Sequence, residues 1–331
     1  MPIITLTTGQ QFSARYGETV LDAALRNGVT LEHSCRIGRC TSCKGQVLSG
    51  SASTRHGELG LTLSERAAGW ILSCVSSATT DLVFDARYLG GVTLEPARTL
   101  PCRILALERL TADVMKVTLR LPPSSNFICL PGQYIDVIGH GGLRRSYSVA
   151  NAVLASQRIE LHISKVDGGL MSRYWFDQAK PDDLLRFNGP LGTFFLRGAA
   201  GMDLLLLATG TGIAPIKAIL EGLVGAQTSD LPRSVTIFWG CRFASDLYWN
   251  PVTLSSNHRF VPVLSRADAS WAGARGHVQQ AVLVAAPDLG NAAVYACGSY
   301  AMIQSARTEL VAAGLPKNSF YSDAFVSSSA A

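Results

Sequence analysis

Four cysteines have the residue type and the spacing of an iron–sulfur ligand set. Cys35, Cys40 and Cys43 follow the pattern C-x4-C-x2-C, and Cys74 comes about thirty residues later. Each iron of a 2Fe-2S cluster needs two thiolates, so three ligands on one loop and a fourth from a distant segment complete both irons. Gly38 permits a tight turn that directs backbone amides toward the sulfides. The spacing therefore predicts a 2Fe-2S cluster at these cysteines.

Two other interpretations of the same cysteines stay open at this stage. The thiols could be buried structural groups, or they could bind zinc. Structural zinc sites usually combine two C-x2-C pairs, however, and this loop has one such pair, Cys40 and Cys43. Arg36 and Arg39 add positive charge beside the loop. We expect an electron-accepting protein to reach the edge of the cluster beside these two arginines.

A second group of residues has the chemistry of a flavin site. Arg145, Ser146, Tyr147 and Ser148 follow a glycine-rich turn. A flavin needs a cation for its pyrophosphate, an aromatic plane against its ring, and a hydrogen-bond partner near N5, the atom that accepts a hydride. Arg145, Tyr147 and Ser148 supply these three groups. The same tetrapeptide also occurs in ordinary exposed strands, so an exposed strand remains the alternative.

A third motif has the form of a nucleotide-binding loop. The apolar strand Leu204–Ala208 runs into Gly210-Thr211-Gly212, and Pro215 falls in the first turn of the helix that follows. Glycines allow close approach of the backbone, and a helix N-terminus offers free amides to a phosphate. The pattern predicts a phosphate site, with a plain strand–helix turn as the alternative.

The elements that must position these groups indicate a multidomain α+β and α/β protein. We expect a small α+β domain over residues 1–90, a linker over 91–101, an antiparallel β-barrel over 102–199 and a parallel α/β domain over 200–331. The linker contains Gly91, Pro96 and Pro101 and shows no sustained period.

Local signals place the elements within these domains. In the first domain we expect a helix over Thr19–Asn27, stopped by Gly28, and a second helical turn with a capping box from Thr62 to Glu65. In the barrel segment, alternating strands are expected at Val117–Leu121, Tyr134–Ile138 and Ile159–Ile163. In the last domain, apolar strands that each precede a helical stretch are expected at Leu204–Thr209, Ser234–Trp239, Arg259–Leu264 and Ala293–Ala296.

Composition narrows the class of protein. The 331 residues are 47 % hydrophobic and 16 % charged, and the net charge of +5 is spread without a basic block, which gives no support for nucleic-acid binding. Eight cysteines are too few for a disulfide scaffold, and their clustering indicates metal binding. The N-terminal residues lack the features of a signal peptide, and no apolar run is long enough to span a bilayer. We expect a soluble, cytoplasmic protein.

Taken together, the motifs resemble the ferredoxin–NADP⁺ reductase superfamily, specifically its members that carry an N-terminal plant-type ferredoxin. The resemblance covers nearly the whole chain. It implies a β-grasp ferredoxin domain, an FAD-binding barrel and a Rossmann-like NAD(P)-binding domain. The segments that carry it, besides the cysteines, are 131–136, 145–148, 162–165, 168–172, 189–195, 210–215 and 295–299.

The resemblance also implies roles for individual residues. It places Ser148 at flavin N5, Cys297 near the nicotinamide carbon that carries the hydride, and Phe325 on the flavin face where nicotinamide must stack. Asp323 stands where the plant enzymes have Glu, and we assign it no proton relay. The implied FAD contacts are Arg145, Ser146, Tyr147, Ser148, His162, Lys165, Gly169, Met171, Ser172 and Phe325. The implied dinucleotide contacts are Gly210, Thr211, Gly212, Pro215, Gly240, Arg242, Cys297 and Gly298.

The resemblance implies a reductase that moves electrons from NADH through FAD and the 2Fe-2S cluster to a partner protein. NADPH is the alternative donor, because Ser265-Arg266 could bind a 2′-phosphate. The segments Arg144–Asn151, Val294–Ile303 and Phe320–Val326 most resemble CDP-6-deoxy-glucoseen reductases, which supply a pyridoxamine-phosphate-dependent dehydrase. The alternative is the reductase component of an aromatic-ring dioxygenase or a di-iron monooxygenase, and a third hypothesis is a non-catalytic redox carrier. We expect a monomer.

Overall fold

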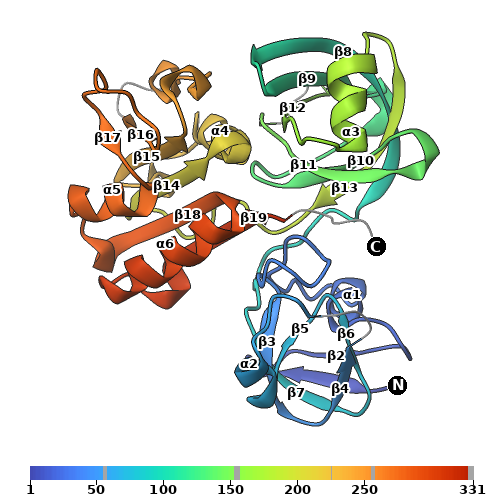
Figure 1. Ribbon diagram of the computed structural model, residues 1–331. Coiled ribbons are helices and arrows are strands. Elements are labelled where there is room, and N and C mark those ends of the chain that lie inside the picture. The colour runs from blue at the N-terminus through green and yellow to red at the C-terminus, as the bar shows by residue number, and fades with distance from the viewer. Residues whose placement is uncertain (55–57, 153–156, 225, 255–257, 327–331) are drawn as a thin grey trace. The chain divides into compact units, whose positions relative to one another are not determined.

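The chain forms two compact units, Met1–Glu95 and Pro96–Ala331, which we describe separately (Figure 1). The computed structural model describes all residues except 55–57, 153–156, 225, 255–257 and 327–331. In the described part of the chain, no helix has the length and apolarity that crossing a membrane requires.

The N-terminal unit is a mixed β-sheet that packs against a helix. Five strands pair in the order β2-β1-β7-β3-β5, and β4 pairs with β6 as a separate ribbon. The strands are β1 (Ile3–Leu6), β2 (Gln11–Ser13), β3 (Lys44–Ser49), β4 (Ala52–Thr54), β5 (Trp70–Leu72), β6 (Ser76–Ala78) and β7 (Leu82–Ala86). The helices are α1 (Val20–Arg26) and α2 (Leu63–Ala67).

Both helices begin and end where local chemistry predicts. The Thr19 hydroxyl caps α1 by accepting a hydrogen bond from the Asp22 N–H, and Gly28 beyond the helix has φ +73°. At α2, Thr62 and Glu65 cap each other's backbone N–H groups in the expected capping box. These caps fix the ends of the helices that flank the cysteine loop in the sequence.

The C-terminal unit begins with an antiparallel β-barrel. Its strands pair in the order β11-β10-β13-β8-β9-β12, and a bridge between Val149 and Leu161 connects the two edges. The strands are β8 (Arg98–Thr111), β9 (Val114–Arg120), β10 (Tyr134–Ile138), β11 (Arg144–Ser148), β12 (Arg158–Ser164) and β13 (Leu184–Leu191). A short helix, α3 (Leu170–Arg173), continues into one π-helical turn (Tyr174–Gln178). The antiparallel barrel predicted from alternation is confirmed.

The first strand of the barrel starts earlier than the sequence indicated. Strand β8 begins at Arg98, so the last four residues of the predicted linker are strand. Pro101 was interpreted as a break, but it pairs with Arg186 of β13 inside the ladder. A proline is tolerated where the strand does not need its N–H.

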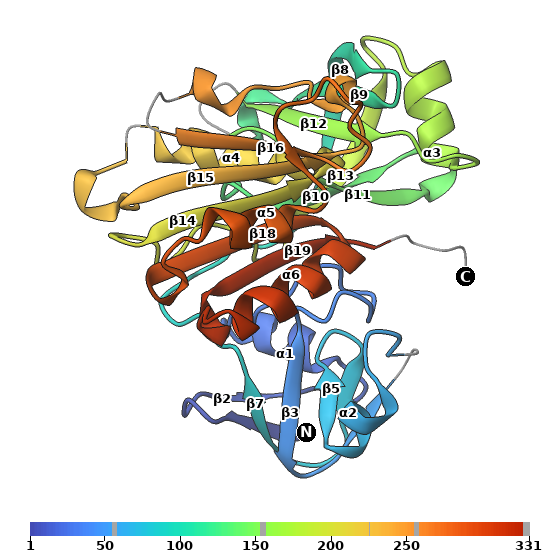
Figure 2. The ribbon, with the colours of Figure 1, turned by 60° about the vertical axis from the view of Figure 1, so that its left-hand side comes forward.

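The second half of this unit is a parallel sheet covered by helices. The strands pair in the order β17-β16-β15-β14-β18-β19. They are β14 (Asp203–Thr209), β15 (Ser234–Cys241), β16 (His258–Leu264), β17 (Ala274–Arg275), β18 (Ala292–Ser299) and β19 (Phe320–Phe325). Helix α4 (Ile213–Leu223) covers one face, and α5 (Val278–Ala285) and α6 (Tyr300–Ala312) cover the other (Figure 2).

The direction of strand order reverses between β14 and β18, which opens a crevice at their carboxyl ends. One expected helix was wrong: after β15, the described residues form only single 3-10 turns at Ala244–Asp246 and Pro251–Thr253. Pro251 restricts the backbone of this connection and removes one N–H that a longer helix would use.

We expect the central strand β14 of the parallel sheet to contribute strongly to the stability of the C-terminal unit. Leu206 of β14 is fully buried, so Leu206→Ala should lower the free energy of unfolding of the C-terminal unit by about 2–5 kcal/mol. Leu283→Ala on the exposed side of α5 is the matched control, because Leu283 is 37 % exposed. Denaturant unfolding followed by tryptophan fluorescence measures both, and equal losses would contradict the assignment of the core.

Candidate functional site

The four cysteines of the N-terminal unit lie in two pairs. The backbone N–H of Cys40 donates to the Cys35 sulfur, and that of Cys35 donates to the Cys40 sulfur, each at 3.4 Å. The sulfurs of Cys43 and Cys74 lie 3.2 Å apart. In the described residues, no three potential ligands are grouped to hold a single metal ion. Two pairs fit two irons with two thiolates each better than one zinc ion.

The backbone of the loop also fits an anionic cluster. Arg36, Gly38 and Thr41 all have positive φ, between 57° and 72°. Such left-handed residues turn successive N–H groups toward one side of the chain, which creates a concave anion site. The Cys40 thiol, together with the N–H groups of Ile37 and Arg39, lowers the pKa of the Cys35 thiol to about 6. The hydrogen bond with Cys35 and burial raise the pKa of the Cys40 thiol well above its usual value, so within this pair the loop favours the anionic form at Cys35.

The positive charge expected beside the loop is partly compensated. Arg36 forms an ion pair with Asp22 of α1. The guanidinium therefore also ties the cysteine loop to the helix that precedes it.

Strand β11 presents the predicted flavin residues on different faces. Arg145 and Tyr147 share one face, and the Trp175 indole N–H donates to the Tyr147 hydroxyl at 3.0 Å. Burial raises the pKa of Tyr147 to about 12, so its hydroxyl stays protonated. Ser146 alternates to the other face and donates to Asp136 at 2.6 Å. Its side chain therefore does not join Arg145 and Tyr147.

The predicted pyrophosphate turn begins at Gly169, the N-cap of α3. No side chain among the described residues caps this helix, and the Ser172 hydroxyl accepts from the Val166 N–H at 2.9 Å. The Met171 side chain is buried in the barrel core, where a Cβ on Gly139 would lie 2.7 Å from its sulfur. Met171 can therefore offer only its backbone to a ligand, whereas its side chain belongs to the core.

Ser148 and Cys297, predicted on separate domains, are both neighbours of Asp323. The Ser148 hydroxyl donates a long hydrogen bond of 3.5 Å to Asp323, and Asp323 is the strand partner of Cys297. All three residues are buried, with exposures of 7 %, 5 % and 0 % for Ser148, Asp323 and Cys297. Burial and the nearby Asp323 carboxylate raise the pKa of the Cys297 thiol well above its usual value. Sequence reasoning gave Asp323 no part in this junction.

A cavity of about 830 Å³ lies between the barrel and the parallel sheet. Its lining includes Lys165 of the barrel segment and Phe325 of β19. It also includes four predicted dinucleotide residues, Gly210, Thr211, Gly240 and Arg242. Phe325 is 40 % exposed and lies two residues beyond Asp323 on β19. Further lining residues that the sequence did not single out include Thr209, Tyr248, His277, Gln279 and Ser305. No local motif marks these positions, because they come together only through the fold.

Two glycines let the nucleotide loop touch the carboxyl end of β18. A Cβ on Gly212 would lie 2.2 Å from the Cys297 carbonyl oxygen. Gly298 has φ +143°, and a Cβ there would lie 2.1 Å from the Thr209 hydroxyl. That hydroxyl accepts from the Ser299 N–H at 3.2 Å. The predicted Gly212 and Gly298 therefore serve this close approach, while Pro215 is buried in the first turn of α4.

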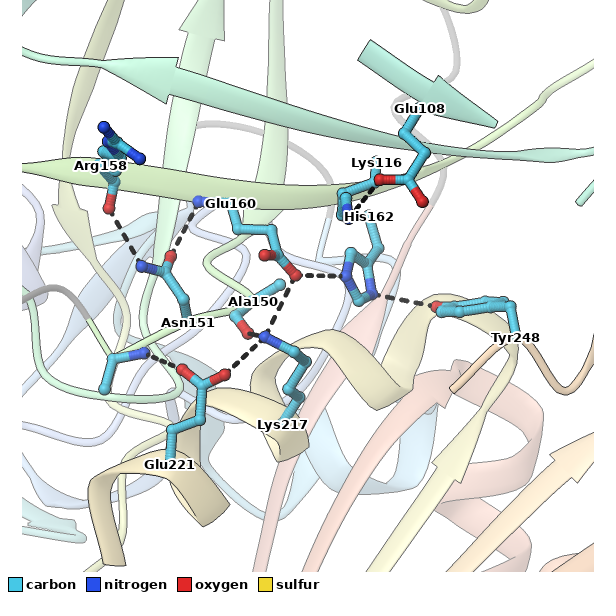
Figure 3. A network of polar contacts seen from close by, with 11 residues as sticks. Glu108, Lys116, Ala150, Asn151, Arg158, Glu160, His162, Lys217, Glu221 and Tyr248 are labelled. Atoms are coloured by element: carbon cyan, nitrogen blue, oxygen red, sulfur yellow. Dashed lines mark hydrogen bonds and ion pairs between the residues drawn. The ribbon is translucent and has the colours of Figure 1, made fainter. Parts of the chain in front are cut away.

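His162, a predicted flavin contact, has partners that the sequence did not indicate. Its ring nitrogens engage Glu160 at 2.8 Å and the Tyr248 hydroxyl at 3.2 Å, and its side chain is 2 % exposed. His162 therefore lies in a polar network between the barrel and the sheet rather than on the lining of the cavity (Figure 3).

Three protein-family models match consecutive parts of the chain. The 2Fe-2S iron-sulfur cluster binding domain matches residues 4–79. The oxidoreductase FAD-binding domain matches residues 101–196, and the oxidoreductase NAD-binding domain matches residues 206–308. These models confirm the cofactor set predicted from the cysteines, the barrel and the glycine loop.

Relatives and a solved structure match nearly the whole chain. The chain is 41 % identical over 325 residues to CDP-6-deoxy-L-threo-D-glycero-4-hexulose-3-dehydrase reductase of Yersinia pestis, covering 97 % of each chain. It is 31 % identical to a xylene/toluene monooxygenase electron transfer component of Pseudomonas putida, covering 96 % of this chain and 91 % of that one. The crystal structure of an Amycolatopsis cytochrome P450 reductase superimposes with a TM-score of 0.80 at 29 % identity, covering 99 % and 100 %.

These findings define the class of the protein. A 2Fe-2S domain, an FAD domain and an NAD domain in one chain constitute an NAD(P)H-dependent oxidoreductase that transfers electrons. The chain belongs to the ferredoxin–NADP⁺ reductase superfamily, among the members whose FAD- and NAD-binding domains are fused to a 2Fe-2S ferredoxin domain.

Proposed function

We propose that this reductase supplies electrons to a pyridoxamine-phosphate-dependent dehydrase in the 3-deoxygenation of a nucleotide sugar. The observation that carries the proposal is the 41 % identity, over nearly the whole chain, to a reductase named for a CDP-6-deoxy-L-threo-D-glycero-4-hexulose-3-dehydrase. The second candidate acceptor is an oxygenase component, which the relative named for xylene/toluene monooxygenase supports at 31 % identity. The cofactor sites are common to both classes, so the difference in identity favours the dehydrase.

The residues at the junction of the two domains divide the work of hydride transfer. When bound, FAD accepts a hydride as an electron pair and releases electrons singly to a one-electron acceptor. We assign Ser148 to flavin N5, because its hydroxyl is buried and lies within 3.5 Å of Asp323, beside the strand that carries Cys297. Cys297 stays a neutral thiol, which suits it to contact an uncharged nicotinamide ring rather than to act as a nucleophile.

The remaining residues hold the ends of the cofactors. Tyr147 offers its ring to the flavin and Arg145 its charge to the pyrophosphate. Phe325 covers the ring face and must move when nicotinamide enters; its 40 % exposure leaves it the freedom to do so. Glycine loop amides at the start of α4 receive the dinucleotide phosphates.

We favour NADH as the donor. Of the pair that could bind a 2′-phosphate, Ser265 is among the described residues that line the cavity and Arg266 is not. The Arg266 side chain is exposed, and its backbone N–H donates to the Arg242 carbonyl. A solvated arginine outside the cavity contributes little to selection of NADPH.

We also propose that the protein is a cytoplasmic monomer. All eight cysteines are free thiols, which is the usual state of cysteine in a reducing compartment. A monomer leaves the cysteine loop accessible to the acceptor, as electron transfer between proteins requires.

The first test is an anaerobic titration with NADH and, separately, with NADPH. We expect NADH to bleach the flavin absorbance and then to produce the electron paramagnetic resonance signal of the reduced cluster. NADPH should need a higher concentration for the same extent of reduction. A preparation that contains flavin and cluster but stays oxidised with both nucleotides would contradict the reductase assignment, and preference for NADPH would contradict the donor assignment.

The Cys40→Ser variant tests the order of the two redox centres. Because Cys40 is a predicted cluster ligand and lies outside the flavin domain, the variant should lose reduction of one-electron protein acceptors and keep ferricyanide reduction through FAD. Cys102→Ser, which changes a cysteine in the barrel outside the cluster loop, should keep the visible absorbance of the cluster. Loss of both activities together with bound flavin would show that the two centres are not separable.

Reconstitution identifies the acceptor. With NADH in excess, the protein should support turnover of a CDP-6-deoxy-L-threo-D-glycero-4-hexulose-3-dehydrase at least about tenfold faster than turnover of a xylene monooxygenase, a difference of about 1.4 kcal/mol. Product formation by each partner is the measurement, with ferricyanide reduction as the control for an active reductase. Faster turnover of the oxygenase would establish the second candidate.

A further inference from the structure

A polar network joins the barrel to the helix that follows the nucleotide loop (Figure 3). The Lys217 ammonium of α4 contacts Glu160 of β12 at 3.2 Å and Glu221 at 2.6 Å, and it donates to the Ala150 carbonyl at 3.1 Å. Glu221 in turn accepts from the Ala152 N–H at 2.9 Å. Helix α4, which covers the parallel sheet, is therefore hydrogen-bonded to the chain just after strand β11.

The segment that Lys217 contacts directly follows the strand with the predicted flavin residues. Ala150 lies two residues beyond Ser148, the residue assigned to flavin N5. The Ala150 N–H donates to the Glu160 carbonyl at 2.8 Å, and the Glu160 N–H donates to the Asn151 side chain at 2.8 Å. Glu160 thus holds both Lys217 and the end of the flavin strand.

A second branch of the network leads to the nucleotide loop. Glu160 accepts from His162, so the other ring nitrogen of His162 accepts from the Tyr248 hydroxyl. The Tyr248 ring packs edge-on against Trp239 at 5.0 Å, and the Trp239 indole N–H donates to the Gly210 carbonyl at 2.9 Å. Contacts therefore run without a break from the barrel to the loop that receives the dinucleotide.

Glu160 and His162 each keep one protonation state near neutral pH. Burial by itself would raise the pKa of Glu160, but the hydrogen bond from His162 and the charge of Lys217 lower it to about 2. Burial lowers the pKa of His162, which keeps its ring neutral and consistent with the hydrogen bonds described above. The Lys217 and Glu160 side chains are 13 % and 22 % exposed. A partly buried ion pair of this kind contributes little net stability, because desolvation offsets much of its attraction.

We propose that Lys217 and His162 are positioning residues for hydride transfer. Lys217 fixes α4 against the end of the flavin strand, and His162 fixes Gly210 through Tyr248 and Trp239. Together they set the spacing between the nicotinamide held by the sheet and the flavin held by the barrel. The inference rests on the proposed hydride path, and it extends that path to residues that touch neither reacting ring.

The test is stopped-flow reduction of the flavin by NADH in Lys217→Met. We expect the limiting rate of reduction to fall about 10- to 100-fold, the effect of misplacing reacting groups by about 1 Å, with the dissociation constant of NADH nearly unchanged. Amide hydrogen exchange of the cofactor-loaded protein should accelerate in α4 and in residues 149–152. Lys217→Arg, which keeps the charge, should restore much of the rate.

Lys317→Met is the matched control. It removes the same charge from the parallel-sheet half that carries Lys217, but Lys317 is exposed and lies in the 3-10 turn before β19, at the amino end of that strand. An unchanged reduction rate in Lys217→Met, or an equal fall in Lys317→Met, would overturn the inference. A loss of NADH affinity at an unchanged limiting rate would also overturn it, because Lys217 would then act in binding.

Two further measurements keep the test decisive. If Lys217→Met does not yield a folded flavoprotein, Glu221→Gln preserves the side-chain volume and removes one charge, and it should lower the limiting rate in the same direction; no decrease would overturn the inference. Flavin reduction of the unaltered protein by NADH distinguishes failure of the proposed function from failure of the positioning role. If that protein is not reduced by NADH, the proposed function fails, whereas normal reduction with an unaffected Lys217→Met rejects the positioning role alone.

Discussion

The contact between two stretches of backbone at the reversal point of the parallel sheet constrains the whole catalytic unit. Gly212 lies against the Cys297 carbonyl, and Gly298 lies against Thr209, at separations that leave no room for a Cβ at either glycine. This contact brings the start of α4 directly beside the end of β18. The backbone amides at the start of α4 and the Cys297 thiol are therefore held at one edge of the sheet, where open α/β folds bind their ligands.

From that edge, the structure must align a nicotinamide with a flavin held by a different set of strands. The Ser148 hydroxyl reaches Asp323 on β19 by a single long hydrogen bond of 3.5 Å. A hydrogen bond of this length is weak and cannot hold two domains in register. The alignment instead depends on the larger network around Lys217, Glu160 and His162, which contacts both strand β12 and helix α4.

The sequence identified the three cofactor-binding domains through groups of neighbouring residues. The cysteine spacing, the glycine loop and the strand that carries Arg145 and Tyr147 each depend on a few consecutive positions, and short segments constrain their own geometry. The pattern did not indicate where the individual side chains point, because adjacency along a strand differs from adjacency in space. Ser146 belongs to the motif but alternates to the face of Asp136, and the Met171 side chain turns into the barrel core.

Residues whose roles depend on distant partners could not be predicted in the same way. Lys217 lies 57 residues from Glu160, and His162 lies 86 residues from Tyr248. A lysine on a helix and a histidine on a strand have many ordinary explanations, and no spacing rule connects them. Only the packing of α4 against β12 identifies these residues as one unit.

The polar character of this connection has a physical reason. The free energy gained from an apolar contact is roughly proportional to the buried area. Small sliding movements of the two surfaces change that area, and therefore the free energy, only slightly. Hydrogen bonds weaken steeply as their angle and distance depart from the optimum. The contacts of Lys217 with Glu160 and the Ala150 carbonyl therefore favour one arrangement of α4 against the barrel over slightly shifted ones. Hydride transfer depends on sub-ångström placement of two rings. A directional contact that adds little to stability is therefore better suited to this boundary than a larger apolar one.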